Sequence, residues 1–164
     1  MNNRGVSRKF SNIQPFNLQP SEPSLELVVF SIGKLNLALQ IESVYKITNY
    51  EPIYADGLGY IGVAHIDDQE ITVVNLYQRL FKSQQSDESP ANNCLLIVQN
   101  SKEELFGIPV IDTPKLIEVP LSQIRGLPEA YRRADTLEIA SHVAVIPQAE
   151  TKLTLFVVDV DQLC

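Results

Sequence analysis

The sequence predicts a mainly β protein made of two similar small units. Three observations carry this prediction. Short runs of β-branched and apolar residues recur along the chain, polar turns separate them, and the order of runs in the first half is repeated in the second. Each half ends in a strand that leads into a short segment with helical spacing. We therefore expect about five short strands per unit, each unit consistent with a small barrel, and little helix.

The composition supports a folded, acidic protein. At 164 residues and 45% hydrophobic content, the chain suits one globular domain or two very small ones that share a core. Residues 25–164 carry 10 basic and 19 acidic residues, a net charge of −9. Such a domain gains no counterion release from phosphates, which argues against nucleic acid and anionic membranes as partners. A basic protein surface is the better candidate.

The lack of a signal-peptide pattern and the spacing of the cysteines favour a cytoplasmic protein. The N-terminus lacks a signal-peptide core, and no apolar run approaches the ~18 residues that span a bilayer. Cys94 and Cys164 are the only cysteines, without the C-x-x-C spacing of zinc or redox sites. We expect both to be reduced in a soluble cytoplasmic protein without membrane insertion.

Two polar stretches divide the chain. Residues 1–24 are rich in Asn, Ser, Gln and Pro and predict a flexible N-terminal arm. Residues 82–93, "KSQQSDESPANN", predict a connector. The first barrel is thus expected at about 25–81 and the second at about 94–164.

In the first half, residues 25–33 and 34–41 predict two strands joined around Gly33-Lys34 as a hairpin. In the segment 42–50, "ESVYKITNY", the three-residue spacing of Val44 and Ile47 predicts one helical turn before extended chain. The runs "YIGVAHI" and "EITVV" then flank Asp67-Asp68-Gln69, a composition typical of a hairpin turn.

The second half repeats this order, with predicted strands at 94–100, 104–112, 115–119, 138–146 and 152–158 and a long polar loop before the last two. The two endings match best. "ITVVNLYQRL" and "LTLFVVDVDQL" each lead from a strand into a short apolar-spaced segment, with Asn75 and Asp159 at the expected N-cap positions.

The stretch from Gly62 to Leu80 offers a possible chemical site, because His65, Asp67, Asp68 and Glu70 are all acid/base or metal-binding types. One histidine and two adjacent aspartates fall short of a zinc or hard-cation ligand set, so a solvated hairpin tip is the favoured interpretation. A metal-assisted hydrolase at His65, Asp67 and Asp68 remains the enzyme alternative. A small β-barrel that binds single-stranded nucleic acid is another, although the negative charge fits it badly.

The remaining polar residues give no further site. His142 is expected as a partly exposed strand residue, and the basic cluster at 125–135 as a solvated loop with a smaller chance of gripping an acidic partner. No nucleophile, phosphate-loop or metal motif occurs. We expect no catalytic residue, metal or cofactor.

Four blocks of the chain resemble the CheW family of bacterial chemotaxis couplers across about 25–163: "LVVFSIGKLNLALQIESVYKI", "YIGVAHIDDQEITVVNLYQRLF", "LLIVQNSKEELFGIPVIDTPKLIEVP" and "LTLFVVDVDQL". The resemblance implies a non-enzymatic adaptor of two five-stranded SH3-like β-barrels around a shared hydrophobic core. It implies two partners, the regulatory domain of a CheA-type histidine kinase and the cytoplasmic tip of a methyl-accepting chemoreceptor. Relatives serve chemotaxis, phototaxis or pilus-based motility.

The chain departs from the family pattern at the hairpin. The family usually reads Gly-Val-Ile-Asn-Leu-Arg-Gly where this chain has residues 62–68, so Asp67 replaces the Arg and Asp68 the Gly. Lys46 stands where relatives commonly carry an acidic residue that pairs with that Arg. We therefore predict a Lys46–Asp67 ion pair of inverted polarity.

The resemblance also suggests candidate protein-binding residues. Val44, Lys46 and Ile47 match the receptor groove. Ile47 is favoured as a core residue, and Val44 suits the core and the groove equally well. Asp67, Asp68 and Gln69 are candidates for a kinase-facing or groove-facing surface.

Overall fold

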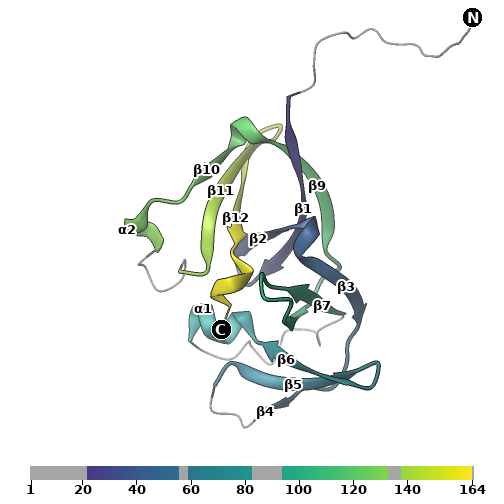
Figure 1. Ribbon diagram of the computed structural model, residues 1–164. Coiled ribbons are helices and arrows are strands. Elements are labelled where there is room, and N and C mark those ends of the chain that lie inside the picture. Colours follow the sequence, from purple (N-terminus) through teal and green to yellow (C-terminus); the bar gives the residue numbers. More distant parts are fainter. Residues whose placement is uncertain (1–21, 56–58, 83–93, 133–137, 164) are drawn as a thin grey trace, which may run out of the picture.

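The computed structural model describes residues 22–55, 59–82, 94–132 and 138–163. Nearly all of the predicted connector and of the predicted N-terminal arm lie outside these ranges. Two six-stranded sheets make up most of the described chain (Figure 1). Two short α-helices, α1 (Leu76–Phe81) and α2 (Glu129–Arg132), and three turns of 3₁₀-helix complete it. The predicted mainly β fold with little helix is confirmed.

Sheet I has the strand order β10-β11-β12-β2-β1-β9. Its strands are β1 (Ser24–Ile32), β2 (Leu35–Gln40), β9 (Lys115–Pro120), β10 (Ile124–Gly126), β11 (Ala140–Pro147) and β12 (Lys152–Val158). Sheet II has the order β3-β7-β8-β6-β5-β4. Its strands are β3 (Val44–Asn49), β4 (Tyr54–Ala55), β5 (Ile61–Ile66), β6 (Gln69–Val74), β7 (Cys94–Gln99) and β8 (Leu105–Val110).

The predicted repeat is present, but the two units exchange their first hairpins. If β7–β12 are matched in order to β1–β6, both sheets have the same strand order. Sheet I contains β1 and β2 with the last four strands of the second half, and sheet II contains β7 and β8 with the last four strands of the first half. The expected division into one barrel per half, at 25–81 and 94–164, is therefore wrong. Parallel pairs, β2 with β12 and β6 with β8, join the exchanged hairpins to their sheets.

The expected count of five strands per unit missed β4 and β10. These strands have two and three residues, too few to show an alternating pattern.

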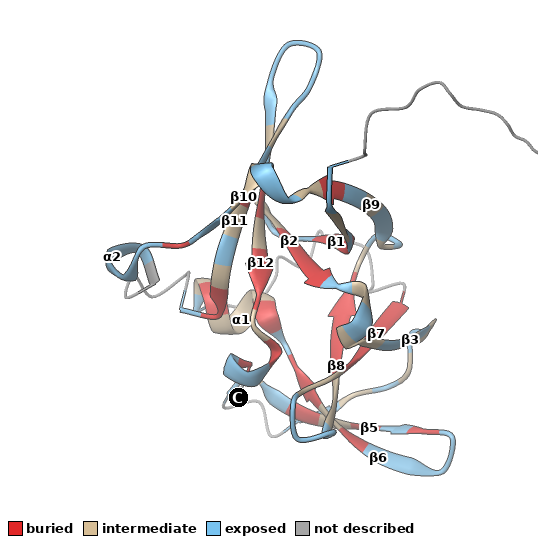
Figure 2. Cartoon of the chain, turned by 45° about the horizontal axis from the view of Figure 1, so that its top comes forward, coloured by how far each residue is buried: buried red, intermediate tan, exposed pale blue. Residues whose placement is uncertain are grey.

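The main hydrophobic core lies between the two sheets. Alternate side chains of a strand point to opposite faces, so neighbouring residues serve different cores. In β7, Leu96 packs in the shared core, and Leu95 packs inside sheet II. The shared core also holds Phe30, Leu37, Leu39, Val98, Ile108, Leu76, Leu80 and Leu163. Figure 2 shows buried segments meeting where the sheets face each other, while the β5–β6 tip projects as an exposed hairpin. The predicted shared core is confirmed.

The helical turn predicted before extended chain is present, but it ends before Val44 instead of spanning Val44 and Ile47. A 3₁₀ turn covers Ile41–Ser43, and from Val44 the chain is extended and pairs with β7. Backbone pairing with β7, together with the β-branched side chains here, outweighs the three-residue spacing that suggested a helix.

Both predicted N-caps are confirmed. The Asn75 side chain accepts a hydrogen bond from the Gln78 N–H at the start of α1. The Asp159 side chain accepts one from the Asp161 N–H at the start of the last 3₁₀ turn, Val160–Gln162. Each satisfies a backbone donor that the short helix leaves unpaired.

Candidate functional site

Asp67 and Asp68 form the two-residue tip of the β5–β6 hairpin. Ile66 pairs with Gln69 across the turn, and the φ angles of Asp67 and Asp68 are 51° and 64°. Positive φ at both central residues is the geometry of a type I′ turn, whose twist matches that of the flanking strands. The predicted hairpin tip is confirmed, and Asp68 adopts the left-handed conformation that glycine adopts without steric cost.

Asp68→Gly is expected to raise the free energy of unfolding by about 0.5 to 1 kcal/mol, because the positive φ is strained for Asp and free for Gly. Urea denaturation followed by circular dichroism measures the change. Gly33→Ala in the β1–β2 hairpin is the opposite change, because it places a side chain at a φ of 59° and 3.0 Å from the Tyr77 and Phe81 rings, and it should destabilise. A destabilising Asp68→Gly would show that the Asp68 side chain supports the turn.

The predicted ion pair between Lys46 and Asp67 is confirmed. Lys46 Nζ donates a hydrogen bond to Asp67 Oδ2. The side chains are 37% and 76% exposed, a setting in which a pair contributes only about 0–1 kcal/mol. Because β3 is one edge of sheet II and the β5–β6 hairpin lies near the other, the pair closes the end of the curled sheet. It positions the hairpin more than it stabilises the fold.

The other candidates of the hairpin do not assemble into a metal site. His65 lies opposite Glu70 across the strands, with Nε2 3.8 Å from Oε2, and its ring contacts Tyr54 edge-on at 6.1 Å between centroids. In the described part of the chain, no three His, Cys, Asp or Glu side chains come close enough together to hold a metal ion. His142 is exposed on β11, beside the Ser141 hydroxyl.

The receptor-groove candidates alternate in exposure along β3. Val44 is half-buried and packs against the shared core, whereas Ile47 is 45% exposed. The expectation that Ile47 belongs to the core is wrong, because β3 is an edge strand and Ile47 belongs to none of the hydrophobic clusters of the described residues. Gln69, at the start of β6, is exposed.

Sequence reasoning missed two exposed tyrosines on the edge strands of sheet II. Tyr45 is 58% exposed between Val44 and Lys46, and Tyr54 is 67% exposed on β4. The alternation of Tyr45 and Ile47 with Lys46 was the available signal, once 44–49 is read as a strand. We give the name β3–hairpin surface to the exposed Tyr45 and Ile47, the half-buried Val44 and Lys46, and the hairpin residues Asp67, Asp68 and Gln69.

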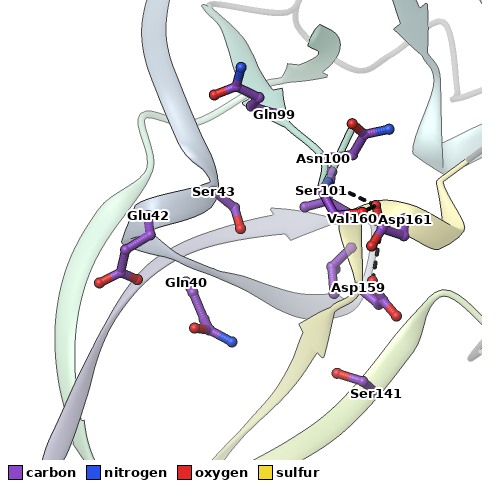
Figure 3. A pocket seen from close by; sticks show the side chains of 11 residues that line it. Gln40, Glu42, Ser43, Gln99, Asn100, Ser101, Ser141, Asp159, Val160 and Asp161 are labelled. Carbon is purple, nitrogen blue, oxygen red and sulfur yellow. Dashed lines mark hydrogen bonds between the residues drawn. The ribbon is translucent and has the colours of Figure 1, made fainter. Parts of the chain in front are cut away.

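A polar cleft of about 340 Å³ lies between the sheets, on the side of β2 and β7 (Figure 3). Its lining includes three carboxylates, from Glu42, Asp159 and Asp161. The backbone N–H and hydroxyl of Ser101 each donate to Asp161 Oδ1 at 3.0 Å, and these bonds lower the pKa of Asp161. They tie the β7–β8 turn of sheet II to the 3₁₀ turn that follows β12 of sheet I.

Comparison with known proteins agrees with this two-sheet fold. The family model for the CheW-like domain matches residues 26–164. The chain belongs to the CheW family. Proteins of this family are non-enzymatic adaptors in chemotaxis signalling, and the expectation that this chain is not an enzyme is confirmed.

One similar solved structure is the crystal structure of the scaffolding protein TtCheW from Thermoanaerobacter tengcongensis. It shares 15% sequence identity with this CheW-family chain, with a TM-score of 0.67 over 88% of this chain and 89% of the other. At that identity the likeness establishes the fold. No match was found among curated proteins. Within the described residues, no helix of this CheW-family protein has the length and apolar character of a membrane span.

Proposed function

We propose that this protein is a divergent CheW-type adaptor that links a CheA-type histidine kinase to the cytoplasmic tip of a chemoreceptor, through the β3–hairpin surface. The observation that carries this proposal is the Lys46–Asp67 ion pair, which holds the hairpin against the exposed edge strand β3. The exposed Tyr45 and Ile47 thus neighbour a charged pair along the same edge strand of sheet II. Such a combination is typical of a specific protein interface.

Within this surface we assign two roles. The exposed Ile47 and half-buried Val44, with Lys46 beside them, face the receptor. Asp67, Asp68 and Gln69 at the hairpin face the kinase or border the same groove. The adaptor would be cytoplasmic and recruited to membrane-associated receptor arrays. It would shift the kinase between its two states through differential contacts, without chemistry of its own.

The inverted polarity of the ion pair would act as a specificity filter. A partner suited to the usual family pattern has charges that complement an acidic residue on β3 and an arginine at the hairpin. On this chain the same partner meets like charges at Lys46 and Asp67. Like-charge contacts reject a wrong partner more strongly than an exposed pair adds affinity. The protein should therefore bind a dedicated kinase and fail to replace a generic chemotaxis adaptor.

Calorimetric titration against the regulatory domain of each CheA-type kinase of the same organism tests the proposal. We expect the wild type to bind one kinase selectively. Asp67→Arg should weaken that binding about tenfold, the size of one lost interfacial charge contact. Lys46→Glu should weaken it as well, because it breaks the ion pair that positions the hairpin. The double variant should regain the ion pair and broaden or redirect the selectivity.

Glu150→Lys is the matched control, because it reverses a charge on the β11–β12 turn, away from the β3–hairpin surface, and should leave binding unchanged. Equal binding to every kinase, or loss of binding by this control, would contradict the assignment of specificity to the hairpin.

A further inference from the structure

The internal repeat allows the two sheets to be compared residue by residue. Strand pairing places Lys46 beside Ile97 in sheet II, and it places Lys115 beside Val29 in sheet I. The same correspondence holds across the next two strands of each sheet. The residues that lie side by side are Lys46, Ile97, Gly107 and Val73 in sheet II, and Lys115, Val29, Ala38 and Val157 in sheet I. Lys115 is therefore the structural equivalent of Lys46.

The carboxylate that pairs with this lysine is present in only one of the two sheets. Counting along the paired strands, the pair Ile66 and Gln69 corresponds to Ile146 and Leu153. The residue after Ile66 is Asp67, whereas the residue after Ile146 is Pro147, which has no charge. Among the described residues, the Lys115 side chain has no ion-pair or hydrogen-bond partner. Its side chain is exposed.

A cavity of about 610 Å³ opens beside this unpaired lysine. Its walls are formed by Val29, Ile117 and Leu153, which also pack against the core inside sheet I. Lys115, Asp112 and Gln148 stand among its polar lining residues. In sheet II, the Lys46–Asp67 pair closes the corresponding end.

We propose that this end of sheet I is a docking site for an acidic segment of a protein partner. A carboxylate of that segment pairs with Lys115 as Asp67 pairs with Lys46. An adjacent aliphatic side chain packs against Val29, Ile117 and Leu153. The site is separate from the β3–hairpin surface and independent of which kinase or receptor binds there.

The remaining polar groups of the lining favour a peptide over a free anion. Asp112 repels a carboxylate but accepts a hydrogen bond from a backbone N–H, which a peptide supplies. The Gln148 amide donates to a backbone carbonyl. The mixture of one cation, one anion, an amide and apolar walls is therefore complementary to an extended acidic peptide with an aliphatic side chain next to its carboxylate.

Nuclear magnetic resonance titration of the full-length, ¹⁵N-labelled protein tests this proposal. The probe is acetyl-Ile-Asp-Asp-Gln-amide, which copies the tip that pairs with Lys46, and acetyl-Ile-Asn-Asn-Gln-amide is its neutral control. We expect saturable shifts in the amides of Val29, Lys115 and Leu153, and binding at least fivefold weaker for the neutral peptide. Added salt should weaken the binding of the acidic peptide.

Variants separate the site from general charge effects. Lys115→Ala should remove the saturable shifts, Lys115→Arg should keep them, and Lys152→Ala should leave them unchanged, because Lys152 is an exposed lysine of sheet I outside the cavity lining. Shifts that survive Lys115→Ala, or that are absent at saturating peptide, would overturn the proposal. Equally tight binding of free aspartate would overturn the assignment to a peptide.

Discussion

Leu96→Ala is expected to lower the free energy of unfolding by about 3 kcal/mol, the size typical of removing a buried leucine from a packed core. Leu96 is 0% exposed and lies in the core that both sheets share. The sheets exchange hairpins and share this core, so neither can unfold without exposing the other. We expect a single cooperative transition in urea, followed by circular dichroism.

Hydrogen exchange shows whether both sheets lose stability together in the Leu96→Ala variant. Leu96→Ala should reduce protection equally in β1 of sheet I and β8 of sheet II, since both open in the same global event. Leu116→Ala is the matched control, because Leu116 is 57% exposed at the edge of sheet I and should change stability by less than about 0.5 kcal/mol. Loss of protection confined to sheet II would contradict a shared core that couples the sheets.

Arg79→Ala is expected to cost about 2 to 3 kcal/mol of stability. Arg79 lies on α1, and its side chain is only 12% exposed. Its Nη1 donates to the backbone carbonyls of Gln162, at 2.7 Å, and Leu163, and its Nη2 lies 3.3 Å from Glu138 Oε1. The guanidinium also lies over the Tyr60 ring, 5.3 Å from its centroid. Hydrogen bonds from a charged donor are worth more than neutral ones, and the cation–π contact adds to them.

These contacts bind α1, which follows sheet II, to the end of the chain that follows sheet I (Figure 1). Arg79→Lys keeps the charge but loses the forked geometry, so it should recover less than half of the stability. Arg125→Ala is the control at an exposed arginine and should be nearly neutral. Thermal denaturation provides the measurement. A neutral Arg79→Ala would mean that water replaces these contacts without cost.

Local features of the fold were predictable from the sequence. Alternation and turn chemistry located the long strands, Asn75 and Asp159 marked two helix starts, and Asp67-Asp68 marked a hairpin tip. Each of these depends on residues close together in the chain. The partnership of Lys46 with Asp67, 21 residues apart, followed only from the family resemblance, because charge alone does not select one partner among several.

Features that depend on distant contacts were not predictable. The exchange of hairpins places β2 beside β12 in a parallel pair, and no local pattern distinguishes this from pairing within one half. Ile47 is an apolar residue of a type usually buried, and its exposure follows from the edge position of β3. The sequence around Arg79 suggests a solvent-facing residue of a short helix. Its buried contacts were not predictable, because its carbonyl partners come from the far end of the chain.

The proposed function requires this protein to link the kinase and the receptor physically. Sedimentation of receptor-containing membranes with the purified kinase, in the presence and absence of the protein, tests it most directly. We expect the kinase to sediment only when the wild-type protein is present. Lys46→Glu should lose this effect, and the Lys46→Glu, Asp67→Arg double variant should change which kinase sediments. Kinase that sediments equally without the protein, or stays in solution with it, would contradict the adaptor role.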